Sequence, residues 1–319
     1  MPEFLQAHTQ QWLEHLRREG YPQVRALGAG VEGAVYDLGD GTVAKVWGRR
    51  HETELLLMQR FYADLASTGL PFATPEILAI KRVNAMAVTH ERKLPGTPLQ
   101  RRLKIEDRHL DPDAVRCVIE VLQALAAVRA TSSMRQLRAL DEDLPFWAGA
   151  DNFQTALLDL LRRRVARFGY LISQQLPDFD RRYASLQEKL AAMAQLADTA
   201  IHGDLVAGNI LVDQDARPLA VLDFGFLTTA GDPRLDAAIS AAVMNMYGPH
   251  APAITAELTA QIAATLNYPV DTLLIYQAAY AVATSNAFTP DGSDGHFAWC
   301  LAQLRRADIT AALGLQLSP

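Results

Sequence analysis

The sequence predicts an α+β fold with two lobes, in which a small antiparallel sheet comes first and a mostly helical region follows. Between residues 24 and 91, apolar and polar residues alternate in short stretches, a pattern typical of strands. Beyond residue 112 the apolar residues recur at helical spacing instead. A connector rich in proline and glycine, residues 93–98, separates the two patterns. Because 319 residues are many for one compact core, we expect two lobes, at 1–93 and 94–319.

The N-terminal lobe is expected to begin with an additional helix. Residues 3–19 place Trp12 and Leu16 on one apolar face, and Gly20-Tyr21-Pro22 ends the helical pattern. Asp40-Gly41 between two alternating stretches indicates a hairpin turn. The further elements expected in this lobe are strands at 24–27, 35–38, 42–47, 76–81 and 85–91, and a helix at 51–66.

The C-terminal lobe is expected to be helical apart from one pair of short strands. Three helices come first, and the strands that follow are joined by a turn at 213–218. The basic run Arg162-Arg163-Arg164 favours a solvated helix face over a binding patch. The expected elements are helices at 112–130, 153–171 and 181–197, strands at 209–212 and 219–222, further helices from about residue 232, and a loop at 290–295.

Composition excludes several classes of function. The formal net charge of −6 gives no support to a nucleic-acid partner. Cys117 and Cys300 lack the spacing of metal ligands, and so few cysteines indicate a reducing compartment. The first twenty residues lack the apolar core of a signal peptide, and no apolar run is long enough to span a bilayer. We therefore expect a cytoplasmic protein with no membrane partner, and the oligomeric state stays open.

A glycine-rich segment follows the first expected strand. Gly28, Gly30 and Gly33 form a G-x-G-x-x-G pattern, and the residues after it read as a second strand rather than a helix. Strand, glycines and strand make the arrangement in which a hairpin tip covers nucleotide phosphates, since a Cβ atom would hold the backbone away from the phosphate oxygens. A plain glycine-rich hairpin explains this segment equally well when it is considered alone.

A lysine lies within the third expected strand. Lys45 stands between the apolar residues of Val43-Ala44-Lys45-Val46. In phosphoryl-transfer enzymes such a lysine contacts the α- and β-phosphates and is held by a glutamate on the next helix. Glu52 and Glu54 are both candidates for that glutamate. Glu54 is preferred because Leu57 and Phe61 would then pack beneath it.

The strongest signal is a set of three residues at fixed spacing. The segment 202–209 reads His-Gly-Asp-Leu-Val-Ala-Gly-Asn, and 223–225 reads Asp-Phe-Gly after the expected strand pair. Asp204 can accept the proton of an attacking hydroxyl, while Asn209 and Asp223 offer the oxygen ligands that magnesium prefers. Each residue alone is more often a turn, loop or strand-end residue. Their order and spacing, together with Lys45 and the glycines, predict phosphoryl transfer from a nucleoside triphosphate.

These motifs resemble those of the aminoglycoside phosphotransferase and choline kinase-like family. His-Gly-Asp-Leu-x-x-x-Asn, Leu-Asp-Phe-Gly and Gly-Asp-Pro-x-x-Asp at 231–236 carry the resemblance, which covers most of residues 24–245. It implies a two-lobed protein-kinase-like fold, with ATP or GTP and Mg²⁺ bound between the lobes and an acceptor pocket built by the C-terminal helices. It also implies Asp204 as catalytic base, Asn209 and Asp223 as metal ligands, Lys45 on the phosphates, and an adenine-binding hinge around Glu91 to Leu94.

The chain departs from the family pattern at several positions. Val206 and Ala207 stand where many relatives have histidine and proline, and neither change removes a metal ligand. Phe226 follows the Asp-Phe-Gly where an acidic residue is frequent, which implies an altered acceptor side. Asp232 and Asp236 are expected to cap and anchor the following helix rather than to bind substrate.

The acceptor is the open question of the sequence. A polycationic aminoglycoside calls for several carboxylates, yet those after residue 225 are scattered: Asp232, Asp236, Glu257, Asp271, Asp291, Asp294 and Asp308. Aromatic residues there can stack on a sugar, a macrolide or a quaternary amine, although most are expected in the core: Tyr247, Tyr268, Tyr276, Tyr280, Phe288, Phe297 and Trp299.

We expect a small-molecule kinase that acts on a hydroxyl of an antibiotic or sugar-like acceptor. A metabolic kinase of the choline, homoserine or methylthioribose type is the alternative within the same chemistry. A nucleotide-binding pseudokinase is disfavoured, because Lys45, Asp204, Asn209 and Asp223 are all present. A protein substrate is disfavoured by Gly203 and Val206, where protein kinases usually carry arginine and lysine.

Overall fold

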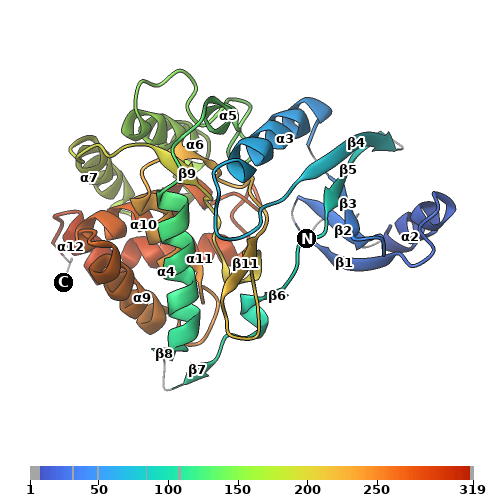
Figure 1. Cartoon of the computed structure of the whole chain (residues 1–319). Coiled ribbons are helices and arrows are strands. Elements are labelled where there is room, and N and C mark those ends of the chain that lie inside the picture. The colour runs from blue at the N-terminus through green and yellow to red at the C-terminus, as the bar shows by residue number, and fades with distance from the viewer. Residues whose placement is uncertain (1–7, 31, 49, 84, 107–108, 317–319) are drawn as a thin grey trace. The chain divides into compact units, whose positions relative to one another are not determined.

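The computed structural model describes residues 8–30, 32–48, 50–83, 85–106 and 109–316. It divides into two compact units. The first contains Met1–Gly96 and Leu219–Leu222, and the second contains Thr97–Pro218 and Asp223–Pro319. The first carries an antiparallel sheet with helices and the second is mainly helical, so the predicted fold class is confirmed (Figure 1).

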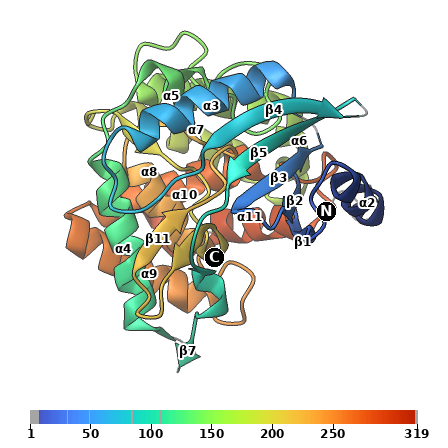
Figure 2. The same cartoon turned by 45° about the vertical axis from the view of Figure 1, so that its right-hand side comes forward.

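The first unit is built on a five-stranded antiparallel sheet. Figure 2 displays its strands, which follow the order β1-β2-β3-β5-β4. The expected strands and the helix at 51–66 are confirmed within a few residues. The elements are α2 (Thr9–Arg18), β1 (Arg25–Ala29), β2 (Gly33–Asp37), β3 (Thr42–Trp47), α3 (Glu52–Ala66), β4 (Ile77–Val83) and β5 (Met86–Arg92). The part of the expected first helix before residue 8 lies outside the described residues.

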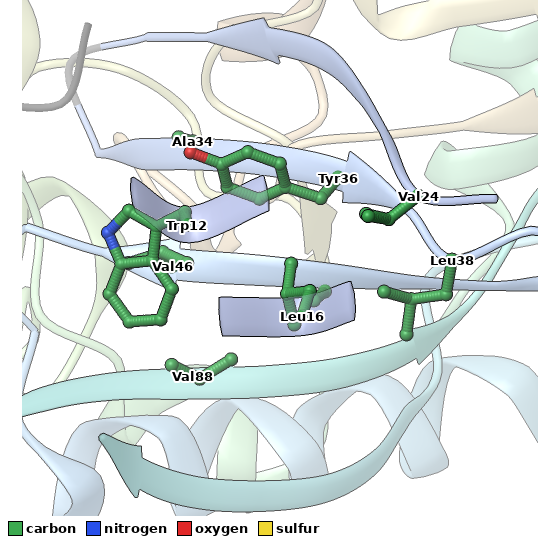
Figure 3. Packing of buried hydrophobic residues seen from close by; sticks show 9 residues of the cluster. Trp12, Leu16, Val24, Ala34, Tyr36, Leu38, Val46 and Val88 are labelled. Atoms are coloured by element: carbon green, nitrogen blue, oxygen red, sulfur yellow. The ribbon is translucent and has the colours of Figure 1, made fainter. Parts of the chain in front are cut away.

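Helix α2 covers one face of this sheet. Trp12 and Leu16 of the helix pack on side chains of β2, β3 and β5, including Tyr36, Val46 and Val88, all of them buried (Figure 3). Because side chains alternate between the two faces of a strand, Lys45 belongs to the opposite face from Val46. The additional N-terminal helix therefore closes the face of the sheet that does not carry the lysine.

The β2–β3 hairpin turns at Asp40-Gly41, as predicted. Oδ1 of Asp40 accepts a hydrogen bond of 2.9 Å from the backbone N–H of Thr42. Gly39 and Gly41 have φ angles of 84° and 88°, in the left-handed region that glycine adopts without a steric penalty. The residues of the turn alone therefore determine its conformation, which is why the sequence predicts it.

Most of the second unit consists of helices packed around α10. This helix has buried side chains all round, from Leu273 to Thr284, and contacts α6, α7, α8, α9, α11 and α12 (Figure 1). The helices are α4 (Pro112–Ala126), α5 (Ser132–Gln136), α6 (Phe153–Gln175), α7 (Phe179–Ala191), α8 (Arg234–Val243), α9 (Ala251–Leu266), α10 (Val270–Thr284), α11 (Gly295–Arg305) and α12 (Ala307–Ala312).

Short strands and turns complete the fold. The expected strands at 209–212 and 219–222 correspond to β10 and β11, whereas β9 and β12 pair with each other and were not expected, because three residues carry no alternation. The elements are β6 (Thr97–Pro98), η1 (Leu99–Arg101), β7 (Ile105–Glu106), β8 (His109–Leu110), β9 (Thr199–Ile201), η2 (Ala207–Asn209), β10 (Ile210–Val212), β11 (Pro218–Val221) and β12 (Thr229–Gly231).

The expectation of a solvated face for the basic run in α6 is wrong for Arg164. Its side chain is only 1% exposed, and its guanidinium pairs with Asp141 in the loop before α6. Its Nε also donates to the carbonyl of Ala283 in α10 at 2.9 Å. The run was misjudged because sequence alone does not reveal that loop 137–152 returns to pair with α6. Arg162, by contrast, is 57% exposed.

Replacing Arg164 by alanine should destabilise the protein by about 3–5 kcal/mol, because it removes a buried cation and leaves its partners unpaired. Urea unfolding followed by circular dichroism measures this loss. Arg162→Ala is the matched control and should change the free energy of unfolding by less than about 1 kcal/mol, as for an exposed ion pair. Equal effects of the two substitutions would contradict a buried structural role for Arg164.

Candidate active site

The segment 202–209 forms a loop between β9 and β10, and Gly203 is required at its tightest point. Gly203 has a φ angle of 78°. A Cβ atom at this position would lie 2.4 Å from the carbonyl carbon of Leu227, closer than atoms can approach. The residue type therefore follows from the close approach of the 223–228 segment, and a larger residue would push the two segments apart.

A buried carboxylate of α8 holds this loop. Asp236 is 2% exposed, and its two oxygens accept hydrogen bonds from the backbone N–H groups of His202 (2.7 Å) and Gly203 (2.8 Å). Burial raises the pKa of Asp236 to about 6, against the opposing effect of these two hydrogen bonds. Asp236 was expected to anchor its own helix; instead it fixes the backbone that immediately precedes Asp204.

The turn that carries Asp223 is tied to the same loop. The rings of His202 and Phe224 lie 4.4 Å apart, centroid to centroid. Thr228 Oγ1 donates to the carbonyl of His202 at 2.6 Å and accepts from the N–H of Gly225 at 2.7 Å. The structure thus brings the two motifs of the sequence together within the second unit.

Asp223 itself has a left-handed backbone conformation, with φ of 54°. Aspartate tolerates this region better than most residues do, yet the conformation still costs free energy. Such backbone outliers cluster at functional sites, where surrounding contacts maintain them. The ring contact of Phe224 with His202 and the hydrogen bond from the N–H of Gly225 to Thr228 Oγ1 supply that constraint here.

Asn209 is bonded to the residue that the sequence assigns as base. Its Nδ2 donates to the backbone carbonyl of Asp204 at 3.0 Å. The N–H of Asp204 donates to Nδ1 of His202 at 3.1 Å, which fixes Nδ1 as an acceptor. Because its amide nitrogen is engaged, Asn209 offers Oδ1 as its oxygen donor. The carboxylate of Asp223 also offers oxygen atoms, the ligand type that magnesium prefers, and a shared metal site of the two residues stays a prediction.

A purely acidic metal cluster is not found. Among the described residues, no group of three or more histidine, cysteine, aspartate and glutamate side chains is placed to hold a metal ion. The predicted ligand pair of Asn209 and Asp223 contains one amide and one carboxylate, so it falls outside this kind of cluster.

In the first unit, the three predicted glycines have different roles. A Cβ atom on Gly33 would lie 2.1 Å from the carbonyl oxygen of Val46, so strand pairing explains this glycine. Around Gly28 and Gly30 a Cβ atom would meet no described atom within 4 Å. The packing of the chain does not require glycine at these two positions, which leaves close approach of a ligand as the reason predicted from the sequence.

Lys45 is almost buried and lies beside an acidic residue that the sequence reasoning did not consider. Its Nζ is 3.5 Å from Oε2 of Glu32, in the glycine segment, and 4.1 Å from the centroid of the Trp47 ring. Glu32 was missed because the family pattern directs attention to the next helix. Oε2 of Glu54 accepts a hydrogen bond of 2.8 Å from the N–H of His51 at the start of α3. The pairing of Lys45 with Glu54 stays a prediction.

Glu91 is the second-last residue of β5 and still pairs with both neighbouring strands. It is paired with Val43 of β3 and Ile77 of β4, and its Oε1 accepts a hydrogen bond of 2.5 Å from Thr89 Oγ1. Beyond it, the N–H of Lys93 donates to the carbonyl of Gly41 at 3.0 Å. A backbone contact of this segment with a nucleotide base stays a prediction.

Comparison with known proteins shows the family to which this fold and these sequence motifs belong. The model of the phosphotransferase enzyme family matches residues 23–268. The chain belongs to this family, and the predicted resemblance and enzyme class are confirmed.

Solved structures with low sequence identity share the fold of this chain. Aminoglycoside phosphotransferase APH(3'')-Id from Streptomyces rimosus is 18% identical with a TM-score of 0.53, covering 86% of this chain and 98% of that one. Macrolide 2'-phosphotransferase MphH from Brachybacterium faecium is 19% identical with a TM-score of 0.52, covering 92% and 97%. A GDP complex of an aminoglycoside 2'-phosphotransferase-IIIa mutant is 15% identical with a TM-score of 0.59, covering 97% and 95%.

Two further findings complete the comparison. The search of curated proteins found no match. Within the described residues, no helix combines the length and the apolar character needed to cross a membrane.

The raised pKa of Asp236 predicts a specific pH dependence of stability. A carboxyl group whose pKa is higher in the folded than in the unfolded state stabilises the fold fully below its unfolded pKa of about 3.9, and this contribution is lost as the pH rises through about 6. Asp236→Asn cannot ionise and so lacks this dependence. The free energy of unfolding of the wild type, relative to that of the asparagine variant, should therefore fall between pH 5 and pH 7.5.

Urea unfolding of both proteins at the two pH values measures this difference, and other titrating groups cancel because both proteins share them. A relative stability that rises with pH would mean that the ionised carboxylate is the favoured form in the folded protein, which would contradict the prediction.

Proposed function

We propose that this protein transfers the γ-phosphoryl group of ATP or GTP to a hydroxyl group of a small molecule. The observation that carries the proposal is the fixed loop 202–209: Asn209 donates to the carbonyl of Asp204, and His202 joins the loop to the segment 223–228 through Thr228 and Phe224. Relatives of similar fold are described as complexes with ADP and streptomycin or with GDP and kanamycin, which supports a nucleotide donor and a small acceptor.

The reaction forms one bond and breaks one. The acceptor oxygen bonds to the γ-phosphorus while the bond from that phosphorus to the bridging oxygen breaks, and the nucleoside diphosphate leaves with the electron pair. Asp204 orients the acceptor hydroxyl and takes its proton. Such a base contributes about 10²- to 10⁴-fold to the rate.

The other predicted residues position charge. Lys45 binds the phosphates, and the backbone at Gly28, Gly30 and Gly33 approaches them. Asn209 and Asp223 would hold Mg²⁺, which neutralises phosphate charge when bound. Glu54 would hold Lys45 in place, and the backbone around Glu91 would contact the adenine or guanine ring of the nucleotide. An antibiotic or sugar-like acceptor is favoured, a metabolic alcohol is the alternative, and we place the enzyme in the cytoplasm.

Asp204→Asn tests the assigned base. It should lower the rate of transfer by about 10²-fold or more, because the amide cannot accept the hydroxyl proton, while nucleotide binding stays within about threefold. Release of ADP or GDP in the presence of hydroxylated small molecules measures transfer, and calorimetry measures binding. Asp215→Asn, an exposed aspartate of the neighbouring turn, is the matched control. A variant with full turnover would remove Asp204 from this role.

Asn209→Ala tests the metal site. Loss of an oxygen donor should raise the magnesium concentration for half-maximal nucleotide binding by about tenfold, a cost near 1.4 kcal/mol. A magnesium titration of nucleotide affinity measures the shift. An unchanged titration in this variant and in Asp223→Asn would exclude both residues as ligands.

A further inference from the structure

Three aromatic side chains of the second unit are exposed beside the catalytic loop. Tyr247 is 65% exposed and Phe288 is 39% exposed, in contrast to the buried Tyr276, Tyr280 and Trp299. Phe226 is half-buried and follows directly after the Asp-Phe-Gly. We call Phe226, Tyr247 and Phe288 the aromatic platform.

The members of the platform are physically connected. The rings of Phe226 and Phe288 lie 6.0 Å apart and nearly parallel, at an angle of 13°. The ring of Phe288 meets the edge of His296 at 4.9 Å, and Tyr247 Oη lies 3.1 Å from His296 Nδ1. The three side chains therefore form one surface around a single buried histidine.

His296 is a rigid support for this surface. Burial lowers the pKa of His296 to about 4, so the ring is neutral at pH 7, with one nitrogen donating and the other accepting. Its Nε2 lies 3.0 Å from Thr284 Oγ1, and its ring stacks on Trp299 at 5.4 Å. Tyr247 is thus held by its hydroxyl while most of its ring stays accessible.

The platform adjoins Asp204 through the backbone. Leu227, the neighbour of Phe226, lies against Gly203, where a Cβ atom would approach within 2.4 Å. Burial raises the pKa of Tyr247 to about 12, and the negative charges of Asp294 and Asp204 add to this effect. The aromatic surface and the proposed base consequently belong to one site.

Carboxylates near the platform are already engaged by the protein. The N–H of Leu140 donates to the carbonyl of Phe226, which places the loop before α6 next to the platform. In this loop, Asp141 pairs with Arg164 and Arg167. Glu142 pairs with Arg163. These ion pairs offset the negative charge of Asp141 and Glu142, which weakens their attraction for a polycation. Asp143, the next residue, is exposed.

The two carboxylates on the Phe288 side are engaged as well. Asp294 caps α11 by accepting the N–H of Phe297 at 2.8 Å, and it also accepts from Thr289. Asp291 accepts from the N–H and the hydroxyl of Ser293, at 3.1 and 2.8 Å. The close acidic pair of the sequence therefore shapes a loop rather than an amine-binding site.

We propose that the aromatic platform binds the acceptor and selects a molecule with an uncharged, apolar ring face and at most one amine, over polycationic aminoglycosides. This inference rests on the proposed transfer to a small acceptor. Exposed, pinned aromatic rings gain free energy by stacking on a sugar or aryl face, whereas paired carboxylates gain little from additional cations.

The experiment compares four probes: 4-nitrophenyl β-glucopyranoside, which is neutral; erythromycin, which has one amine; and kanamycin and streptomycin, which are polycations. Calorimetry measures the binding of each probe to the nucleotide-loaded protein at about 50 and about 500 mM salt. We expect the first or second probe to bind at least about tenfold more tightly than the polycations, with little dependence on salt.

Phe288→Ala should weaken binding of the preferred probe, and raise its KM, by about tenfold with kcat changed less than about threefold. Phe288→Trp should retain binding, and Tyr170→Ala, at another exposed aromatic residue on α6, is the matched control. Tight, salt-sensitive binding of kanamycin, an unaffected Phe288→Ala variant, or no binding of any apolar probe would overturn the platform. Binding without phosphoryl transfer would instead contradict the proposed function and leave the platform intact.

Discussion

The fold of the catalytic loop depends on one buried carboxylate. Asp236 is buried, and its two oxygens accept hydrogen bonds from the N–H groups of His202 and Gly203. Burying a carboxylate is unfavourable unless it is fully hydrogen-bonded, and here both donors come from the loop itself. Any rearrangement of the backbone before Asp204 would therefore leave a buried acid unpaired, so this contact sets the position of the loop.

From this anchor the constraint extends to the turn that contains Asp223, the proposed metal ligand. His202 accepts from Thr228 through its carbonyl and contacts the ring of Phe224, and Thr228 in turn accepts from Gly225. Asp223, in a left-handed conformation, is thus maintained by contacts that begin at Asp236. The same segment continues into Phe226 and joins the aromatic platform, so the catalytic and acceptor-binding parts share one backbone support.

Much of this could be predicted because spacing encodes chemistry. The spacing of Asp204, Asn209 and Asp223 predicted that the two segments meet, and the structure brings these segments into contact; the metal and base roles of the three residues stay predictions. The sequence predicted that Asp236 anchors its own helix, whereas it accepts hydrogen bonds from residues more than thirty positions away, which sequence spacing does not reveal. Glu32 beside Lys45 and Arg164 beside Asp141 were missed for the same reason: ion pairs between distant segments leave no periodic pattern.

The central claim is that Asp204, Asn209 and Asp223 act as one phosphoryl-transfer centre. A crystal structure with magnesium and a non-hydrolysable ATP analogue tests it most directly. The account predicts that Oδ1 of Asn209 and the carboxylate of Asp223 ligate the metal at about 2.0–2.1 Å, with the Asp204 carboxylate directed to the acceptor side of the γ-phosphate. A metal bound by other residues, or a γ-phosphate remote from Asp204, would contradict it.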